Sequence, residues 1–443
     1  MIEDFIEQRK DQLVQIVSNA IKIKSTEELP EEGAPFGKGV KEALVYALKV
    51  SEDLGFKAVN LNNVLGYAEF GEGDEVISVL GHLDVVPEGT DWKYPPYGGE
   101  THEGRLYGRG TIDDKGPIFA ALFGLYALKE TQTKLSKRVR IIFGTNEETG
   151  WKCMDHLKAV LRDPLIGFTP DAEFPVINRE KGILNVTLRK DFATRNEEVY
   201  IVGGERPNMV PDHAEARFNH KIELELVDSD VYIQGNTVVA RGISAHGALP
   251  EKGKNAISMI ANAIKSSIAN EEVKDIIRFI NEAVGKEVDG RSLGIKMSDE
   301  PSHDLTANLG TIEVNESYGT LTFNIRYPVT KDYKDIVSKI ALTASKYGLK
   351  VAQIRNQDPL FVKDDEPLIK TLLAVYEKFT GQKGYTISIG GGTYARAMDK
   401  GVAFGPGMPG MEAVEHMANE YIEISHLVKI TKIYGNAIYE LAK

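Results

Sequence analysis

Hydrophobic positions in the first 180 residues follow two alternating patterns. Residues 38–55 have hydrophobic side chains at helical spacing and end at Gly55, a residue that suits the end of a helix. Residues 115–130 are hydrophobic on most faces, which predicts a buried helix. Between such segments lie short, continuously hydrophobic runs, VISVLG and RVRIIFG, which are typical of buried strands.

Each of the two hydrophobic runs is followed, just after its C-terminal end, by residues that could bind a metal or transfer protons. VISVLG is followed by His82 and Asp84, and RVRIIFG is followed closely by Glu147 and Glu148. The alternation of helices and strands predicts a mainly parallel sheet with helices on both faces. Ligands bind beyond the carboxyl ends of the strands in such sheets. We therefore expect a functional site at this edge of the sheet.

The pattern changes near residue 184. Residues 183–192, 221–246 and 318–330 alternate between hydrophobic and polar side chains, as half-exposed antiparallel strands do. Helical spacing also occurs in this part of the chain, at residues 253–268 and 331–348. These segments predict a separate α+β domain.

Helical patterns return after residue 358 and continue to the C-terminus. We therefore predict an α/β fold, in which a mainly parallel sheet is sandwiched by helices and a second domain is inserted. The catalytic domain would comprise residues 1–183 and 359–443, and the inserted α+β lid domain would comprise residues 184–358.

The composition is that of a globular protein with an excess of acidic groups. Hydrophobic residues make up 42% and charged residues 27% of the 443 residues, and the formal net charge is −12. A chain this acidic lacks the basic face that nucleic acids require, and anionic membranes repel it. It also has no hydrophobic run near the ~20 residues of a membrane span. We therefore expect neither nucleic acid nor membrane as a partner.

Two features concern the compartment. Cys153 is the only cysteine, which excludes an intrachain disulfide and fits a reducing environment. The first 25 residues mix acids and bases, lack the hydrophobic region of a secretory signal, and have hydrophobic positions at helical spacing. Together these features predict a cytoplasmic enzyme.

A set of histidines and acids lies near the predicted strand ends or in loops. The set consists of His82, Asp84, Asp113, Asp114, Glu147, Glu148, Asp171 and His416. Each residue alone has an ordinary structural explanation; Asp113 and Asp114, for example, could cap the helix that follows them. Together they match a dinuclear metal site, because zinc accepts mixed histidine and carboxylate ligands and one carboxylate can bridge two ions. One acid would then be left over as a base.

Six motifs make the sequence resemble a known enzyme family. They are GHLDVVPEG, GRLYGRGTIDDKGP, GTNEETGW, TPDAEFPVINREKG, ERPNMVPDHAEA and HMANEYI, in this order along the chain. In content and order they resemble the motifs of the di-zinc exopeptidases and deacylases, a family that includes carnosinases, aminoacylases and succinyl-diaminopimelate desuccinylase. The resemblance extends from about residue 5 to the C-terminus.

The resemblance implies a set of metal ligands. Asp113 would bridge two divalent ions, with zinc expected and manganese or cobalt as possible substitutes. Glu148 and His416 would complete one metal site, and His82 and Asp171 would complete the other.

The same resemblance implies roles for the neighbouring acids. Asp84 would orient His82, and Glu147 would be the general base. The peptide bond between Asp113 and Asp114 would be cis, as is typical of this family.

The inserted domain would supply substrate contacts. By the resemblance, His246 would reach the substrate carbonyl, and Asn208 and Arg326 would hold the terminal carboxylate. The glycine-rich segment ISIGGGTYARAM lacks the GK[ST] of a phosphate loop. The resemblance places this segment against the C-terminal end of the substrate and implies three further substrate-binding candidates, Gly391, Gly392 and Thr393. Because the inserted domain is larger than we expect in dimeric family members, we predict a monomer in which His246 acts within its own chain.

These roles predict a metal-dependent dipeptidase that acts on small peptides with a free C-terminal carboxylate. A water activated between the two ions would attack the peptide carbon, and Glu147 would carry its proton to the leaving amine. His246 would stabilise the oxyanion. An N-acyl-amino-acid deacylase is an alternative, since the same metals and base would serve it. A non-catalytic binding protein is a second alternative, against which the complete set of ligands argues.

Overall fold

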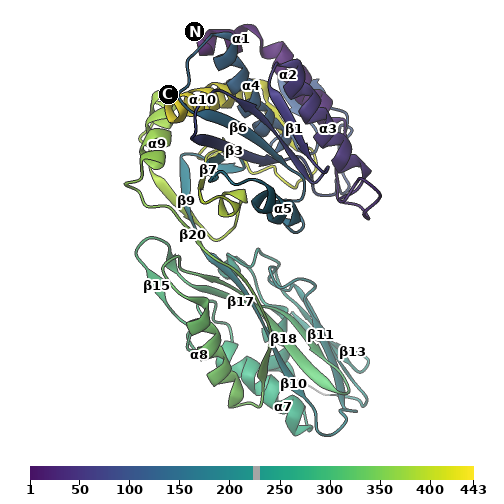
Figure 1. Cartoon of the computed structure of the whole chain (residues 1–443). Coiled ribbons are helices and arrows are strands. Elements are labelled where there is room, and N and C mark those ends of the chain that lie inside the picture. The colour runs from purple at the N-terminus through teal and green to yellow at the C-terminus, as the bar shows by residue number, and fades with distance from the viewer. Residues whose placement is uncertain (223–229) are drawn as a thin grey trace. The chain divides into compact units, whose positions relative to one another are not determined.

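The computed structural model describes residues 1–222 and 230–443 of the chain. The chain forms two compact units, shown in Figure 1. The first unit comprises Met1–Asn178, Val362–Ile387 and Gly392–Lys443. The second unit comprises Arg179–Phe361 and Ser388–Gly391. Each unit has its own hydrophobic core and is described by itself.

The first unit is built on a mixed sheet whose central strands are parallel. In spatial order the strands are β1 (Lys57–Leu61), β2 (Leu65–Phe70), β6 (Arg138–Gly144), β3 (Val76–His82), β7 (Ile166–Thr169), β22 (Lys400–Ala403) and β9 (Val176–Glu180), and β21 (Thr386–Ile389) also pairs with β9. The sheet ends in β20 (Leu360–Phe361), whose residues are counted with the second unit. Strands β6, β3, β7 and β22 run parallel to one another, and the outer pairs are antiparallel. The register pairs His82 with Gly144, so β3 and β6 end side by side.

Helices cover both faces of this sheet. Those of the first unit are α1 (Ile2–Gln8), α2 (Lys10–Ile21), α3 (Lys38–Asp53), α4 (Lys115–Glu130), α5 (Lys152–Val160), α9 (Pro367–Thr380) and α10 (Ile424–Ala442), with a short 3₁₀ helix, η3 (Tyr394–Ala397). Helices α4 and α10 pack against each other and against β3 and β6. Val40 of α3 and Leu157 of α5 share a core with Leu80 and Ile142 of the same two strands. Successive side chains of a strand point to opposite faces of the sheet. Because helices cover both faces, every residue of β3 is buried.

Short strands hold the loops at the carboxyl edge of this sheet. Strands β24 (Tyr421–Glu423), β5 (Arg105–Tyr107) and β4 (Glu100–His102) form a three-stranded sheet, and β8 (Ala172–Glu173) pairs with β23 (Pro406–Gly407). The pairing of β5 with β24 joins segments more than 300 residues apart in the chain.

The second unit contains an antiparallel sheet. Its strands, in spatial order, are β13 (Val231–Gln234), β14 (Thr237–Arg241), β12 (His213–Phe218), β11 (Val199–Gly203), β17 (Thr306–Val314), β18 (Tyr318–Tyr327), β10 (Gly182–Asp191) and β19 (Lys350–Gln357). Strand β10 alternates between buried and half-buried residues, as the sequence pattern predicts. A small hairpin, β15 (Ser298–Asp299) with β16 (His303–Asp304), completes the strands described in this unit.

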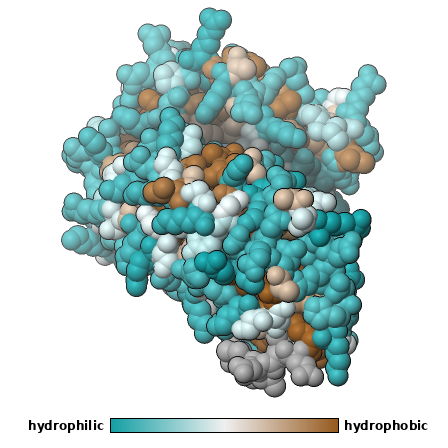
Figure 2. Space-filling model, turned by 90° about the horizontal axis from the view of Figure 1, so that it is seen from below, coloured by the Kyte–Doolittle hydropathy of each residue, from teal (hydrophilic) through white to brown (hydrophobic). Residues whose placement is uncertain are grey.

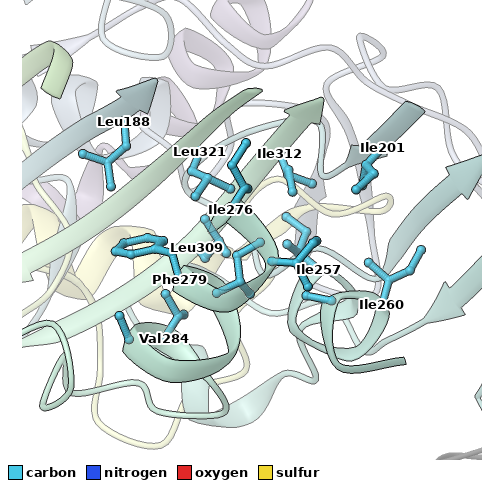
Figure 3. Packing of buried hydrophobic residues seen from close by; sticks show 14 of the residues in the cluster. Leu188, Ile201, Ile257, Ile260, Ile276, Phe279, Val284, Leu309, Ile312 and Leu321 are labelled. Atoms are coloured by element: carbon cyan, nitrogen blue, oxygen red, sulfur yellow. The ribbon is translucent and has the colours of Figure 1, made fainter. Parts of the chain in front are cut away.

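One face of this antiparallel sheet is covered by helices. The described helices of the unit are α6 (Ala256–Ile264), α7 (Glu271–Phe279) and α8 (Tyr333–Ser345), the 3₁₀ turn η1 (Pro250–Lys252) and the π-helical segment η2 (Ile280–Val284). Figure 3 shows Ile257 and Ile260 of α6 and Phe279 of α7 packed in the same cluster as Ile201, Leu309 and Leu321 of the sheet. These residues belong to one continuous hydrophobic core.

The predicted fold class, a parallel-centred α/β sheet with a separate α+β domain, is confirmed. The predicted helix over 38–55 is α3, and Gly55 has the positive φ of 81° that a helix end favours. Part of the predicted strand region 221–246 lies outside the described residues, at 223–229. The N-terminal helical pattern forms two helices instead of one, because the helical dihedrals are interrupted at Arg9.

The surface and the helices agree with the composition. The face shown in Figure 2 is mainly hydrophilic, and its hydrophobic residues occur in small groups. Within residues 1–222 and 230–443, no helix combines the length and the hydrophobicity needed to cross a membrane.

Candidate metal centre

His82, the last residue of β3, is fully buried at the carboxyl edge of the first unit's sheet. Its backbone N–H donates to Asp114 Oδ2 over 3.0 Å, and its Nδ1 lies 2.9 Å from the carbonyl oxygen of Asp84. With Nδ1–H donating to that carbonyl, Nε2 is the atom available to bind a metal. Burial acts to lower the pKa of His82, but the carboxylates of Asp113 and Asp84 outweigh it and raise that pKa well above its usual value.

The side chain of Asp84 joins the ends of two neighbouring strands. Its two carboxylate oxygens accept hydrogen bonds from the backbone N–H groups of Glu147 and Glu148, each over 3.1 Å. Its Oδ1 is 3.6 Å from His82 Nδ1, beyond hydrogen-bonding distance. The carbonyl group of Asp84 therefore orients His82, whereas its carboxylate fixes the loop that follows β6.

Asp113 lies between two histidines, in the loop before α4. Its Oδ1 is 2.9 Å from His82 Nε2, and its Oδ2 is 3.0 Å from His416 Nε2. Burial acts to raise its pKa, but the hydrogen bonds from His416 and His82 dominate and lower the pKa far below its ordinary value. The peptide bond between Asp113 and Asp114 is cis, as the family resemblance predicted.

The two glutamates that follow β6 are also largely buried. Glu148 Oε1 is 3.2 Å from His416 Nε2. Burial, together with the charges of Glu148 and Asp113, raises the pKa of Glu147 to about 8. Burial raises the pKa of Glu148 as well. Such acids resist ionisation unless positive charge is brought close to them.

Asp171 and His416 complete the cluster from two further loops. Asp171 Oδ2 lies 3.7 Å from His82 Nε2, and burial raises the pKa of Asp171 well above its usual value. His416 has a left-handed backbone, with φ of 61°, and a side chain that is 54% exposed. Hydrogen bonds to Asp113 and Glu148 raise the pKa of His416 to about 10.

These side chains form two groups of potential metal ligands that share one residue. His82, Asp113 and Asp171 make one group, and Asp113, Glu148 and His416 make the other; in each, one ligand atom per residue lies within 4.8 Å of the others. The donor atoms are imidazole nitrogens and carboxylate oxygens, the set that zinc, manganese and cobalt accept. The residues fit a pair of divalent cations, because such cations would also compensate the buried carboxylates.

The predicted substrate-binding residues of the second unit lie near one another within that unit. A backbone bridge joins Met209 to His246, and the N–H of Gly247 donates to the carbonyl of Asn208 over 2.7 Å. The His246 Nδ1 accepts from the N–H of Ala248 over 3.3 Å, which leaves its Nε2 to carry the proton. Burial and the charge of Arg326 lower the pKa of His246, which favours the neutral ring.

Arg326, near the end of β18, is buried, with 4% of its surface exposed. Its Nε donates to Asn324 Oδ1 over 3.0 Å, and its Nη1 donates to the carbonyl of Gly390 over 2.7 Å. Gly391 follows in the same unit. The guanidinium is therefore held in place by Asn324 of the same strand and by Gly390 of the glycine-rich segment.

Gly392 and Thr393 belong to the first unit. The Thr393 side chain is buried and accepts from the N–H of Ala395 over 3.2 Å, so it caps η3. The structure thus gives Thr393 a local structural role that the sequence analysis did not foresee.

The sequence analysis also missed three buried residues around the cluster. Tyr394 lies edge-on to the ring of His82, with 6.1 Å between ring centroids, and its hydroxyl is 3.0 Å from Cys153 Sγ. Arg109 and Glu420 form an ion pair of 2.8 Å. Glu420 belongs to the same HMANEYI motif as His416. That shared motif was the sequence signal that could have pointed to Glu420.

Comparisons with known proteins give a consistent result. Residues 79–440 match the model of peptidase family M20/M25/M40. The chain is 38% identical to "Putative dipeptidase YtjP" of Bacillus subtilis over 98% of both chains. It is 33% identical to a "Putative dipeptidase" of Staphylococcus aureus, over 100% of this chain and 99% of that protein. The structure of human carnosine dipeptidase 1 has a similar fold, with a TM-score of 0.58 and 16% identity over 99% of this chain and 98% of that one.

Proposed function

This chain belongs to peptidase family M20/M25/M40, and from that premise we propose that it is a metal-dependent dipeptidase acting on small peptides with a free C-terminal carboxylate. One observation carries the proposal: two groups of potential metal ligands share Asp113, and the half-buried Glu147 is close enough to them for the charges of Glu148 and Asp113 to raise its pKa. The names of the Bacillus and Staphylococcus relatives, which this chain matches over nearly its full length, support the same substrate class.

In the proposed enzyme, two divalent cations are held by the shared Asp113. His82 and Asp171 complete one ligand set, and Glu148 and His416 complete the other. Such cations, when bound, polarise a peptide carbonyl and lower the pKa of water. Zinc suits this donor set, and manganese or cobalt can replace it.

Glu147 is the proposed general base. It is half-buried, and its backbone is fixed by the hydrogen bond to Asp84. Its pKa is about 8 without a cation, and positive charge held by the neighbouring ligands would lower that pKa so that the side chain starts as a carboxylate. Glu147 takes the proton of the attacking water and delivers it to the leaving amine, so it begins and ends the cycle as a carboxylate.

Residues of the second unit, with Gly392 and Thr393 of the first, supply the remaining substrate contacts in this proposal. His246, neutral with its proton on Nε2, donates to the oxyanion that forms on the peptide carbonyl. Arg326 and Asn208, with Gly391 and Gly392, hold the substrate's C-terminal carboxylate, which excludes chains that continue beyond that point. Thr393 is proposed to contact the same end of the substrate, in addition to capping η3.

We also propose a specific likeness to the bacterial dipeptidase PepV, in which extra lid sequence would take the place of a partner subunit. On this basis we propose a monomer. Its only cysteine is a buried free thiol, which suits the reducing environment of the cytoplasm.

A hydrolysis screen tests the proposed function. Purified protein would be incubated with zinc, manganese or cobalt and with dipeptides, tripeptides, and acetyl- or succinyl-amino acids. We expect dipeptides to be cleaved far faster than the other substrates. Faster cleavage of acyl-amino acids would instead show a deacylase, and no hydrolysis with any metal would favour a binding protein.

A further inference from the structure

A buried ion pair, Arg109 with Glu420, contacts the loops that carry two of the proposed metal ligands. Neither residue of the pair is itself a proposed ligand. Arg109 Nη1 donates to Glu420 Oε2 over 2.8 Å, and the side chains of Arg109 and Glu420 are 2% and 0% exposed. A buried ion pair is weak evidence for stability, because desolvation of both charges offsets their attraction. The other contacts of this pair indicate what it does.

Glu420 binds the backbone of the loop that carries Asp113. Its carboxylate accepts from the N–H of Gly110 over 3.0 Å, of Ile112 over 3.0 Å, and of Asp113 itself over 3.3 Å. One side chain thus fixes three points in four consecutive residues. A hydrophobic replacement could fill the space but could not accept these hydrogen bonds.

Arg109 binds the loop that carries His416 and the loop that follows His82. Its Nη1 also donates to the carbonyl of Met417 over 3.2 Å, next to His416 in the chain. Its Nη2 donates to the carbonyls of Pro87 and Glu88, each over 3.4 Å. The guanidinium therefore joins three loops of the first unit.

The adjacent strand pairing brings these loops together. In the antiparallel ladder of β5 and β24, Tyr107 is paired with Tyr421, and the N–H of Gly108 donates to the carbonyl of Glu420 over 3.0 Å. The Asp113 loop leaves this ladder at Tyr107 and the His416 loop enters it at Tyr421. The ion pair closes the space between the two loops just beyond the ladder.

We propose that Arg109 and Glu420 form a positioning pair that sets the separation of Asp113 and His416, and so the affinity of the metal site that these two residues share with Glu148. The inference rests on the proposed function, since it assumes that the ligands hold cations. Glu148 is held by a different residue, Asp84, so the pair acts on two of the three ligands of that site. His82 and Asp171 are not among its hydrogen-bond partners, which makes the effect unequal between the two sites.

The test compares cation binding in Glu420→Gln with that in a matched control. Glu69→Gln disrupts another buried arginine–glutamate pair of the same unit, in which Glu69 Oε2 accepts from Arg140 Nε over 2.9 Å. Glu69 is paired with Arg140 near the start of β6, whereas the cluster lies beyond the C-terminal end of that strand. Zinc and manganese titrations of metal-free protein would measure the stoichiometry and the two affinities of each variant.

We expect the wild type and Glu69→Gln to bind two cations alike, and Glu420→Gln to bind one of its two cations about 10- to 100-fold more weakly. Amide hydrogen exchange at Gly110, Ile112 and Asp113 should be faster in metal-free Glu420→Gln than in the control. If Glu420→Gln does not fold, Glu420→Asp and Arg109→Lys are used instead, since each keeps both charges of the pair. The same weaker binding of one cation and the same faster hydrogen exchange are expected for them.

Equal cation affinities in Glu420→Gln and the wild type would overturn the positioning role while leaving the proposed function intact. An equal loss of affinity in Glu69→Gln would also overturn it, because a general loss of stability would then explain the effect. A wild-type chain that binds no divalent cation would refute both the proposed function and this inference.

Discussion

At the scale of single residues, backbone groups and carboxylates of neighbouring loops define the cluster. The carbonyl of Asp84 orients His82, and the carboxylate of Asp84 fixes the backbone of Glu147 and Glu148. Such partners select the tautomer and direction of a ligand, so a change in them alters metal affinity without removing a ligand. Glu147 differs from the other acids of the cluster, because the role that we propose for it is proton transfer.

Replacement of Glu147 by glutamine tests that difference. Glu147→Gln should lower kcat by about 10²- to 10⁴-fold, because the amide cannot accept the proton, while the five ligands stay in place. Turnover and bound metal would be measured on the same preparation. A variant that keeps wild-type turnover, with its metal unchanged, would contradict the assignment of the base.

The metal-free protein should become less stable as the pH rises. Burial raises the pKa of Glu147 from 4.5 to about 8, and hydrogen bonds to Asp113 and Glu148 raise that of His416 from 6.5 to about 10. Between the unfolded and folded pKa values of each group, the folded state holds a proton that the unfolded chain has released. The free energy of unfolding therefore falls as the pH rises through that range. For His416, the stabilisation is complete below pH 6.5 and is lost through pH 10.

Thermal midpoints of chelator-treated protein, measured from about pH 5 to about pH 9, check this sign. Glu147→Gln should remove the part of the slope that belongs to Glu147, and saturating zinc should flatten the remainder by replacing the bound protons. Burial lowers the pKa of Lys115 to about 7, which acts in the opposite direction above that pH, so the slope lost in Glu147→Gln is the decisive reading. A Glu147→Gln slope equal to that of the wild type would be inconsistent with the raised pKa of Glu147.

At the scale of secondary-structure elements, the site depends on where β3 and β6 end. Gly144 ends β6, and a Cβ added there would lie 2.5 Å from Cε2 of the buried Tyr394. Tyr394 in turn packs edge-on to His82. The close packing of a glycine, an aromatic ring and a ligand fixes this corner of the sheet.

Gly144→Ala should therefore destabilise the protein by about 1–3 kcal/mol through overpacking. Gly150→Ala is the matched control, since its Cβ would meet nothing closer than Asn146 Oδ1 at 3.6 Å. Urea unfolding of both variants measures the difference. Equal stabilities of the two variants would show that Tyr394 moves aside at little cost.

The sequence predicted most elements of the first unit, because their hydrophobic patterns are long and distinct. Helix α4 has the predicted bounds, 115–130, and β3 matches the run before His82. Helix α7 was not predicted, although Asn270 caps it and Val273, Ile276 and Ile277 are buried at helical spacing. Its continuation into a π-helical segment depends on packing in the second unit's core and has no local signal.

The motifs of the sequence identified the candidate ligands, which the structure brings together, but not their supports. His82, Asp113, Glu148, Asp171 and His416 could be named because they follow strand ends or resemble family motifs. The contacts of Glu420 with Gly110 and Ile112 join residues about 310 positions apart, and no local pattern reports such a pairing. The carboxylate of Asp84 was expected on His82 but binds the next loop, because the backbone carbonyl is closer.

At the scale of the whole molecule, membership of a peptidase family confirms the prediction of an enzyme of this class. All five proposed metal ligands belong to the first unit, whereas Asn208, His246 and Arg326 belong to the second. Cation binding should therefore stabilise the first unit directly.

Removal of the metal tests this division. A cation present at about 100 to 1,000 times its Kd stabilises the unit that binds it by roughly 3–4 kcal/mol. We expect chelation to lower the unfolding midpoint of the first unit, as followed by hydrogen exchange in β3 and β6, with little change in β10 and β18. A uniform change in both units would contradict the assignment of all ligands to the first.

The central claim is that Asp113 is shared by two cations that the first unit binds. Elemental analysis of wild-type protein and of Asp113→Ala, each dialysed against zinc and then against buffer, tests it most directly. We predict two zinc ions per wild-type chain and the loss of both tight sites in the variant, together with its hydrolytic activity. A wild-type chain without zinc, or a variant that retains as much zinc as the wild type, would contradict the account.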